Sequence, residues 1–357
     1  SLAVTVLKNS AVLLLFLLFI SCGTKNKEYA NNVFPYSQFP QEKELKGEVI
    51  ELDTALFRYP FRIRIEGDKA IVLDLHGSDY YGHLFQYPSF RYLSSFGRRG
   101  DSPLEMLSME NFRLHNHTLW TLDANKSELT RLDFSSSGDS LLREETVALD
   151  EDILRPLDFA IYNDTTFVIP DYSGESRFLK VDCKGKLIEK IGTIPTTNKK
   201  ALQEARPALA QAWRSFLDYN SHNSVLATVT QLGEVVEIYN LKDSTHVIRV
   251  GEYDEPEFKV SDGYGIPTGI MGFSDVQVTD DAIYAVFHGT SFKDIARQSG
   301  RLSDGGKYIY VFSLKGEPLC KYALDHYIYG IWVDEVTKTI MATDVNNDQP
   351  ILKFSFG

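Results

Sequence analysis

The chain has 357 residues, of which 43% are hydrophobic and 12% aromatic, and its formal net charge at pH 7 is −12. A chain of this length can bury a large core, and it exceeds one ordinary domain unless that domain is built from repeats. The negative charge excludes a general nucleic-acid binder, because such proteins displace phosphate counterions with a basic patch. The longest basic clusters here are the pairs Arg98–Arg99 and Lys199–Lys200.

The N-terminus predicts a secretory signal. The apolar run Ala11–Ile20 is too short to span a bilayer, so it indicates a signal peptide rather than a membrane helix. Its end is similar to bacterial lipoprotein signals, in which a small residue precedes a cysteine that becomes lipidated. We expect residues 1–21 to be a lipoprotein signal peptide and residues 22–46 to be the lipidated Cys22 with a flexible tether. An ordinary signal peptide cut near Ser21 is the alternative.

From residue 47 to residue 357 one pattern recurs six times: four short strand-like runs separated by polar turns. The second runs begin near Ile71, Leu119, Thr166, Ser224, Ile283 and Thr339, which are 47 to 59 residues apart. An innermost strand precedes each of them, at Phe61–Ile65, Asn111–Leu114, Leu157–Tyr162, Phe216–Tyr219, Phe273–Val278 and Tyr327–Val333. Repeats of this length and content predict an all-β, six-bladed β-propeller of four-stranded antiparallel blades.

The last repeat ends after its third run, so its outer edge needs a partner strand. The strand-like run Glu48–Asp53 is the candidate, because it lies just before the first blade. We expect it to pair with Ile351–Phe356 and close the ring.

The segments Leu122–Gly138 and Ser95–Met106 look like NHL-type repeats, and residues 47–357 as a whole resemble the TolB-like six-bladed propeller lipoproteins of Bacteroidetes. The resemblance implies the propeller fold and a location in the cell envelope, and says little about chemistry. Lys25 and Lys27 follow Cys22 where an acidic run would be associated with export to the cell surface. This favours an outer-membrane lipoprotein that faces the periplasm.

The long connections all fall on one face of the predicted disc. They are residues 98–109, 193–215, 251–272 and 288–306, and each joins two blades or the second and third strands of one blade. The other face has only short turns. Long loops on a rigid scaffold are the usual place for binding residues, so the loop-rich face is the predicted binding face. Its ligand-binding candidates are Arg98, Arg99, Trp213, Tyr264, His288 and Arg297.

The connection between blades 3 and 4 shows helical spacing of apolar residues over 199–217, with Pro207 starting or kinking the helix. This short helical insertion either caps a blade junction or forms a lid over the central pocket.

Two sets of polar residues recur in the repeats. Asp74, Asp123, Asp171 and Asp344 end second strands, where an aspartate that caps a tight turn is the favoured interpretation. Asn111, Asp158, Asp218 and Asp275 belong to four neighbouring inner strands. Their oxygens either converge at the channel mouth to hold a hard cation such as Ca²⁺, or act separately as loop caps or solvated carboxylates.

No serine-hydrolase elbow, phosphate loop, dinucleotide fingerprint or zincin motif occurs in the sequence, and no catalytic residue is assigned. The function that the sequence favours is an envelope binding or scaffold propeller, monomeric, that takes a protein, peptide or glycan partner through its loop-rich face. It would be attached to the membrane by the lipid on Cys22 and would bind no nucleic acid. The competing hypothesis is a calcium-dependent enzyme similar to propeller lactonases or lyases.

Overall fold

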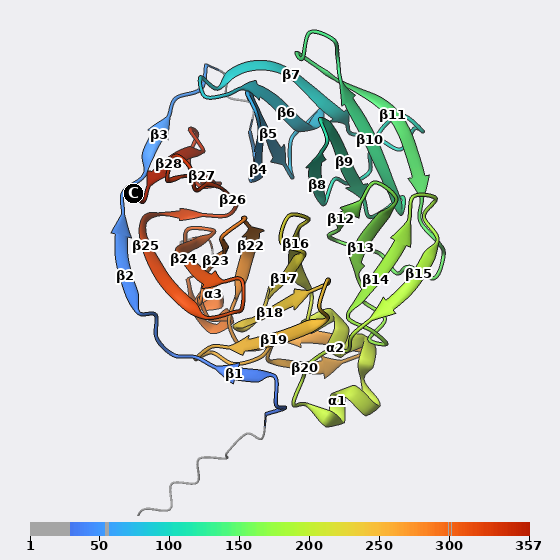
Figure 1. Cartoon of the computed structure of the whole chain (residues 1–357), viewed down its shortest axis with the longest axis vertical. Helices are drawn as coiled ribbons and strands as arrows, with labels where there is room; N and C mark the ends of the chain where they lie inside the picture. The colour runs from blue at the N-terminus through green and yellow to red at the C-terminus, as the bar shows by residue number, and fades with distance from the viewer. Residues whose placement is uncertain (1–28, 54–56, 299, 301) are drawn as a thin grey trace, which may run out of the picture.

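The computed structural model describes residues 29–53, 57–298, 300 and 302–357, and these residues form six radial sheets around a central axis (Figure 1). Each sheet is a blade whose strands are antiparallel and follow one another outwards from the axis in chain order, except for the strands that the N-terminal segment adds to three blades. The structure is therefore the predicted six-bladed β-propeller. The signal peptide and Cys22 lie outside the described residues.

Blades 1 to 3 have four strands each. In order from the axis they are β4 (Pro60–Glu66), β5 (Lys69–Asp74), β6 (Tyr80–Gln86) and β7 (Arg91–Arg98) in blade 1, β8 (Asn111–His115), β9 (Thr118–Asp123), β10 (Glu128–Phe134) and β11 (Leu141–Ala148) in blade 2, and β12 (Ala160–Asn163), β13 (Thr166–Pro170), β14 (Phe178–Asp182) and β15 (Leu187–Ile191) in blade 3.

Blades 4 to 6 each include a strand from the N-terminal segment. Their other strands are β16 (Ser215–Asn220), β17 (Val225–Thr230), β18 (Val235–Asn240) and β19 (Thr245–Val250) in blade 4, β22 (Phe273–Val278), β23 (Ala282–Phe287), β24 (Gly306–Ser313) and β25 (Pro318–Ile328) in blade 5, and β26 (Ile331–Asp334), β27 (Thr339–Thr343) and β28 (Ile351–Ser355) in blade 6.

The N-terminal segment runs around the rim of blades 4, 5 and 6 (Figure 1). β1 (Val33–Pro35) pairs in parallel with β19, and β2 (Gln41–Leu45) pairs in parallel with β25. The expectation of a flexible tether as far as residue 46 is therefore wrong for residues 33–45. Without this segment, the outer strands of blades 4 and 5 would leave backbone groups unpaired at their edges. β1 and β2 pair with those groups.

Closure of the ring follows the prediction. β3 (Glu48–Ile50) pairs antiparallel with β28, with Ile50 opposite Ile351 and Glu48 opposite Lys353. The pairing is shorter than the predicted run, because the chain turns away after Ile50 to enter blade 1. Leu52 then packs in the apolar layer between blades 6 and 1.

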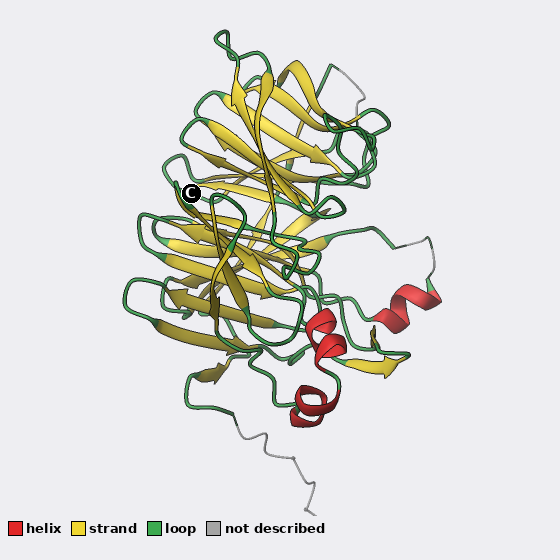
Figure 2. Ribbon diagram, turned by 90° about the vertical axis from the view of Figure 1, so that its right-hand side faces the viewer, coloured by secondary structure: helices red, strands yellow, loops and turns green. Residues whose placement is uncertain are grey.

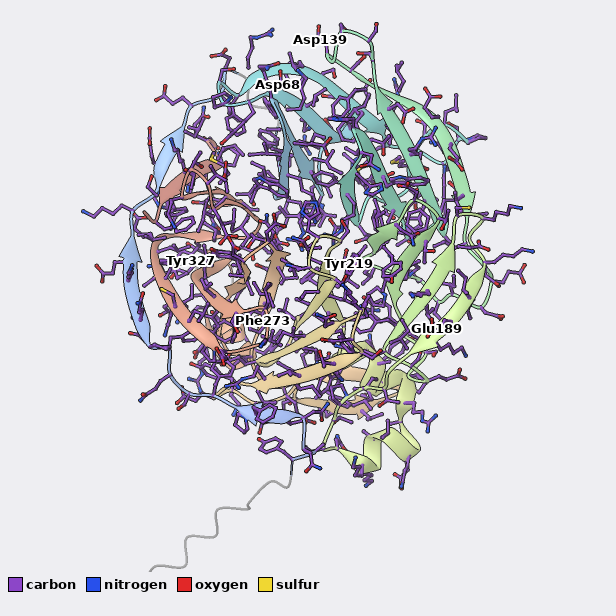
Figure 3. All side chains as sticks on the ribbon, in the orientation of Figure 1. Asp68, Asp139, Glu189, Tyr219, Phe273 and Tyr327 are labelled. Carbon is purple, nitrogen blue, oxygen red and sulfur yellow. The ribbon has the colours of Figure 1, made fainter. Side chains whose placement is uncertain are left out.

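The outer strands of blades 1 to 3, β7, β11 and β15, have no further strand beside them among the described residues. These edges carry charged side chains, such as Glu144 and Glu145 on β11 and Glu189 on β15, and Glu189 lies at the rim of the disc (Figure 3). Charges on an edge strand oppose pairing with another chain.

The core consists of apolar layers between neighbouring blades. A buried cluster joins each blade to the next, and the sixth joins blade 6 to blade 1 through residues such as Ile63, Val72 and Ile351. Both faces of each sheet are thus buried against another sheet, which explains why strands such as β17, β22 and β23 are buried at every position.

The two faces of the disc differ as predicted. One face has short turns, and the other has the long connections, which contain α1 (Lys199–Glu204), α2 (Arg206–Ala212), α3 (Phe292–Arg297) and the hairpin of β20 (Phe258–Ser261) and β21 (Tyr264–Pro267) (Figure 2). None of the helices in the described part of the chain is long and apolar enough to span a membrane.

Pro207 lies in the first turn of α2, so the predicted helix is divided into α1 and α2. Leu209 and Trp213 pack against Val235 and Ile248 of blade 4. The insertion therefore packs on blade 4, and the Trp213 carbonyl accepts a hydrogen bond from Arg177 beside blade 3. This fits the predicted cap of a blade junction, and the packing gives no support to a lid over the central pocket.

Candidate functional site

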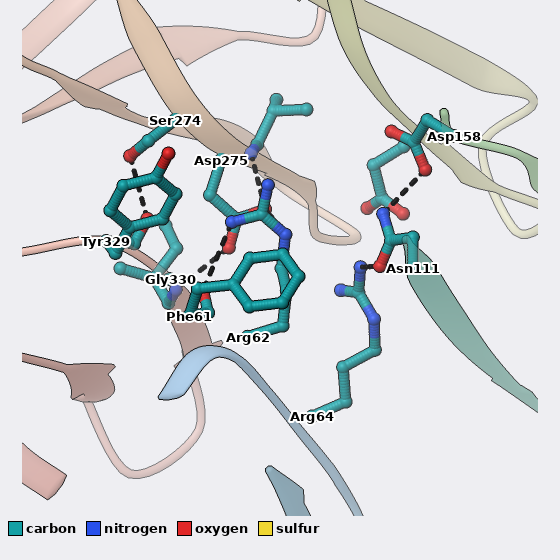
Figure 4. Close-up of polar contacts among 12 residues, drawn as sticks. Phe61, Arg62, Arg64, Asn111, Asp158, Ser274, Asp275, Tyr329 and Gly330 are labelled. Atoms are coloured by element: carbon teal, nitrogen blue, oxygen red, sulfur yellow. Dashed lines mark hydrogen bonds and ion pairs between the residues drawn. The ribbon is translucent and has the colours of Figure 1, made fainter. Parts of the chain in front are cut away.

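An arginine of the innermost strand of blade 1 binds blade 2 inside the channel. Arg64 on β4 donates a hydrogen bond from Nε to the backbone carbonyl of Phe112 at 2.8 Å, and from Nη2 to Oδ1 of Asn111 at 3.1 Å (Figure 4). Asn111 in turn donates from Nδ2 to Asp158 of blade 3 at 2.6 Å. Three successive blades are connected by this chain of contacts.

Arg113 on β8 makes the same connection one blade further on. It donates to Asp158 at 3.0 Å and to Asp218 at 2.7 Å, and also to the backbone carbonyls of Phe159 at 2.7 Å and Leu217 at 2.5 Å. One buried guanidinium thus joins blades 2, 3 and 4.

Acidic and amide side chains of the inner strands also accept hydrogen bonds from the backbone N–H groups of the following blade. These bonds run from Leu217 to Asp158 at 2.9 Å, from Val278 to Asp218 at 2.7 Å, from Ile331 to Asp275 at 2.9 Å, and from Val333 to Gln277 at 2.7 Å. We call the set Arg64, Asn111, Arg113, Asp158, Asp218, Asp275 and Gln277 the channel belt.

Arg62 fills the axis next to the belt. Its Nε lies 3.9 Å from the carboxylate of Asp275, and the rings of Phe61 and Tyr329 lie beside its guanidinium (Figure 4). The ring of Phe216 also faces the guanidinium, at 4.6 Å. The side chain is 1% exposed, and Nε and Nη2 have no hydrogen-bond partner among the described residues. Cation–π contacts with the rings compensate in part for the lost hydration.

Charge is balanced locally within the belt. Burial lowers the pKa of Arg113, but Asp158 and Asp218 outweigh burial and hold this pKa above its usual value. Burial, together with the nearby Arg113, lowers the pKa of Arg64 to about 10, so this guanidinium is still charged at neutral pH.

The channel-belt geometry does not fit the predicted Ca²⁺ site. Calcium needs six to eight oxygen ligands, but the oxygens of Asn111, Asp158, Asp218 and Asp275 already accept N–H donors, and arginine side chains take the place of the cation. In the part of the chain that the structure describes, no group of three or more acidic, histidine or cysteine side chains is arranged to hold a metal ion.

The aspartates at the ends of second strands cap turns, as predicted. Asp74 accepts from the backbone N–H groups of Arg58, Tyr59 and His76, and Asp171 accepts from Ser173 and Ser176. Asp123 and Asp344 bind the loops beside them in the same way. Each carboxylate stabilises a second-to-third-strand connection on the loop-rich face.

A cavity of about 750 Å³ lies at the mouth of the channel on the short-turn face. Arg64, Arg113 and Asp218 of the channel belt form part of its wall, and the first-to-second-strand turns, such as those at His115 and His222, form its rim. The predicted binding residues lie on the other face, and this cavity was not predicted from the sequence. Every inner strand ends here, so the channel opens where the turns are too short to cover it.

A smaller cavity of about 280 Å³ lies between blades 4 and 5, beneath the N-terminal segment. Tyr36, Tyr308 and Tyr310 contribute aromatic walls, and Glu234 and Glu252 contribute carboxylates from loops of the loop-rich face. We call it the strap cavity.

A sequence model of the TolB-like 6-blade propeller-like family matches residues 38–336. The chain belongs to this family. A search of curated proteins finds no match to the sequence.

Solved structures similar to this TolB-like propeller show the same fold at low sequence identity. A member of the DUF4221 family from Bacteroides vulgatus is 11% identical, with a TM-score of 0.61, and the match covers 88% of this chain and 98% of that one. A protein from Bacteroides fragilis described as exported is 12% identical, with a TM-score of 0.55 and coverage of 90% and 98%. An auxiliary nutrient binding protein from Bacteroides ovatus is 10% identical, with a TM-score of 0.52 and coverage of 84% and 70%.

In this TolB-like propeller the two predicted arginines of the first long loop have different surroundings. Arg99 lies 3.9 Å from the centre of the Tyr81 ring and binds the Tyr81 hydroxyl and the Leu75 carbonyl, so it supports the loop. Arg98 is 68% exposed and forms a loose 3.8 Å contact with Glu105. Of the two, Arg98 is the one free to meet a ligand.

Trp213 is too deeply buried to meet a ligand on the loop-rich face, whereas His288 is partly exposed beside the strap cavity. Trp213 is 1% exposed and packs under blade 4, where its carbonyl accepts a hydrogen bond from Arg177. Burial lowers the pKa of His288 to about 4, which keeps the imidazole neutral at pH 7. His288 is one of the residues that line the strap cavity.

Tyr264 and Arg297 are exposed on the loop-rich face, as predicted. Tyr264 is 61% exposed on the β20–β21 hairpin, and Arg297 ends α3. The six ligand-binding candidates come from separate loops and do not line one common cavity.

Sequence reasoning missed Arg62, Arg64, Arg113 and Glu234. The signal for the arginines was present, because Phe61-Arg62-Ile63-Arg64 alternates charged and apolar residues on an inner strand that has no face in solvent. Charged residues at such positions must find partners across the axis. Glu234 had no comparable signal, since its cavity forms only when the N-terminal segment reaches blade 5.

Proposed function

We propose that this TolB-like propeller is a cell-envelope binding protein that holds a protein partner against its loop-rich face. The proposal rests on the distribution of exposed large apolar side chains. Eight of those on described residues lie in connections of this face: Leu104, Leu107, Leu154, Tyr253, Val260, Tyr264, Ile266 and Leu302. On the turns of the opposite face the corresponding residue is Val336, and the other five lie on strands near the rim: Phe34, Val49, Leu142, Ile188 and Leu319.

A one-sided distribution of this kind is typical of an interaction surface, because isolated exposed apolar residues would be scattered over both faces. The eight side chains come from four separate connections, so a partner that contacts them must extend across this face rather than fill a single deep pocket. A broad apolar surface with polar surroundings fits a folded protein partner better than a glycan. Peptide and glycan partners are alternatives that the experiment below separates.

A location in the envelope is supported by the predicted lipoprotein signal and by the similar structures that are described as exported and as nutrient binding. The chain between the expected lipid on Cys22 and Val33 of β1 is about ten residues, which spans at most about 35 Å. Because β1 lies at the rim of blade 4, a lipid there would hold the propeller by its edge. Neither face would be covered by the attachment itself.

The β20–β21 hairpin offers the sharpest test, since Val260, Tyr264 and Ile266 project from a two-stranded unit outside the blades. The triple variant Val260→Ser, Tyr264→Ser, Ile266→Ser removes apolar surface without touching the blade cores. Affinity-tagged full-length protein, cross-linked in envelopes and purified, should capture a partner protein that the triple variant loses.

The matched control is Val336→Ser, which removes an exposed valine from the opposite face. Its partner recovery should equal that of the original chain. If the triple variant captures the same partner in the same amount, or if only glycans or short peptides compete for capture, the proposed protein interface is wrong. If the captured protein is a second copy of this chain, size-exclusion chromatography will show a dimer that the triple variant abolishes, and the proposal of a different partner protein fails.

A further inference from the structure

The strap cavity has aromatic walls on several sides. The ring of Phe287 lies 4.8 Å from that of Tyr310 and 5.9 Å from that of Tyr253, and Phe39 of the N-terminal segment lies 4.7 Å from Tyr310. Aromatic faces carry a negative quadrupole and attract cations. This protein already uses that attraction, because Nζ of Lys321 lies 4.5 Å above the centre of the Tyr308 ring.

The charged groups of the cavity leave an excess of negative charge. Three glutamates line it, Glu42, Glu234 and Glu252, and Lys321 is the lysine that lines it with them. None of the three glutamates forms an ion pair within the part of the chain that the structure describes, because no described cation lies within 4.0 Å of their carboxylates. A cationic ligand would therefore find a favourable electrostatic environment.

Glu234 is the most deeply buried of the three glutamates, and its carboxylate lies near the Tyr253 backbone N–H and the Tyr36 hydroxyl. It is 3% exposed, and its carboxylate packs against Gly251 where even a Cβ atom would not fit. Buried carboxylates in proteins are normally paired with a cation or satisfied by several donors. The hydroxyl of Tyr36, also buried, lies near Glu234 without reaching hydrogen-bond geometry with any described residue.

From this arrangement we propose that the strap cavity is a binding site for an organic ammonium group, either a primary alkylammonium or a quaternary ammonium. The carboxylate of Glu234 pairs with the positive charge, and the rings of Tyr308, Tyr310 and Tyr253 contact its carbon-bound hydrogens. The volume of about 280 Å³ suits a small headgroup or one side chain. A bare metal ion is a poorer occupant, because the walls are mainly rings and the carboxylates are not grouped as ligands.

This site is independent of the apolar surface proposed above, and its test does not need the partner. Calorimetric titration of the purified full chain should show saturable binding of choline or n-butylammonium at millimolar concentration. The neutral analogue 3,3-dimethylbutan-1-ol has nearly the same shape as choline without the charge. It should bind at least about tenfold more weakly, because it has no charge for Glu234 or the rings to attract.

Variants separate the contributions. Glu234→Gln removes the charge with little change of shape and should weaken choline binding at least about tenfold. Tyr253→Leu, at a half-exposed position, should weaken it several-fold without disturbing the core. Lys321→Met should strengthen binding, because it removes the cation that now occupies a ring of the cavity. The matched control is Glu144→Gln on the exposed outer strand of blade 2, which should leave binding unchanged.

The pH dependence provides a second readout. Burial raises the pKa of Glu234 to about 7, so the carboxylate is mainly protonated at pH 6 and mainly ionised at pH 8. The ammonium binds the ionised form, so affinity should rise several-fold between these values and then level off. The titratable and charged neighbours that line the cavity with Glu234 are Tyr36, Glu42, Glu252, Tyr253, His288, Tyr308, Tyr310 and Lys321. Glu234→Gln should remove most of this dependence.

Two sources of the ammonium are distinguished by comparing free choline with N-acetyl-lysine amide and its uncharged counterpart N-acetyl-norleucine amide. Tighter binding of the lysine compound indicates the side chain of a polypeptide, and tighter binding of choline indicates a free headgroup. Equal binding of charged and neutral analogues, unchanged affinity in Glu234→Gln, or no saturable binding of any ammonium compound would each overturn the proposal.

Discussion

Arg113 shows how single residues hold the blades together. Its guanidinium contacts two carboxylates and two carbonyls on the two following blades, and the residue is 6% exposed. Breaking a buried pair by removing one partner is costly, because the remaining charges stay buried without compensation. Arg113 is therefore a structural residue of the channel rather than a ligand contact.

The variant Arg113→Ala should lower the free energy of unfolding by about 3 to 5 kcal/mol, because Asp158 and Asp218 lose their cation. The matched control Arg131→Ala removes an arginine that pairs with Asp133 and Glu145 on the surface, at 33% exposure. That loss should be at most about 1 kcal/mol. Denaturant titration of both variants measures the difference, and equal losses would contradict a supporting role for the channel belt.

The N-terminal segment is the element that completes the ring. β1 and β2 cover the edges of blades 4 and 5, and β3 supplies the outer strand of blade 6. The three strands join parts of the chain that are more than 200 residues apart. Such non-local pairing makes the ring cooperative, since blade 6 cannot be completed until both ends of the propeller have met.

Replacing residues 47–53 with a glycine–serine linker of the same length should destroy this cooperativity. Blade 6 would lose its outer strand, and Leu52 would leave the layer that joins blades 6 and 1. We expect a broad or two-step thermal transition at a lower temperature. Val49→Ser, at a 45% exposed position of the same strand, should melt like the original chain. A single unchanged transition in the linker variant would show that the closure strand is dispensable.

At the scale of the whole molecule, the sequence predicted the fold well because each blade repeats a local pattern of strands and turns. The turn-capping aspartates, the ring closure and the contrast between the two faces followed from the same pattern. The course of residues 33–45 did not, because those short polar strands are defined by the blade edges they cover. Asn111, Asp218 and Asp275 lie on inner strands as predicted, and Asp158 lies just before one. Their arginine partners come from other blades and are not adjacent in sequence.

Functional sites were hard to predict for the same reason, because they depend on contacts between segments that are far apart in the sequence. Exposed positions such as Tyr264 could be predicted from a long loop, whereas burial of Trp213 depends on how α2 packs against blade 4. Neither cavity has a sequence signature, since each forms between blades.

The central claim is that the loop-rich face binds a protein partner. Site-specific photo-cross-linking tests it most directly: the full chain carries p-benzoylphenylalanine in place of either Tyr264 or Val336, and intact cells are irradiated. The account predicts a discrete protein adduct from position 264 and none from position 336. An adduct of equal yield from both positions, or one from position 336 alone, would contradict it.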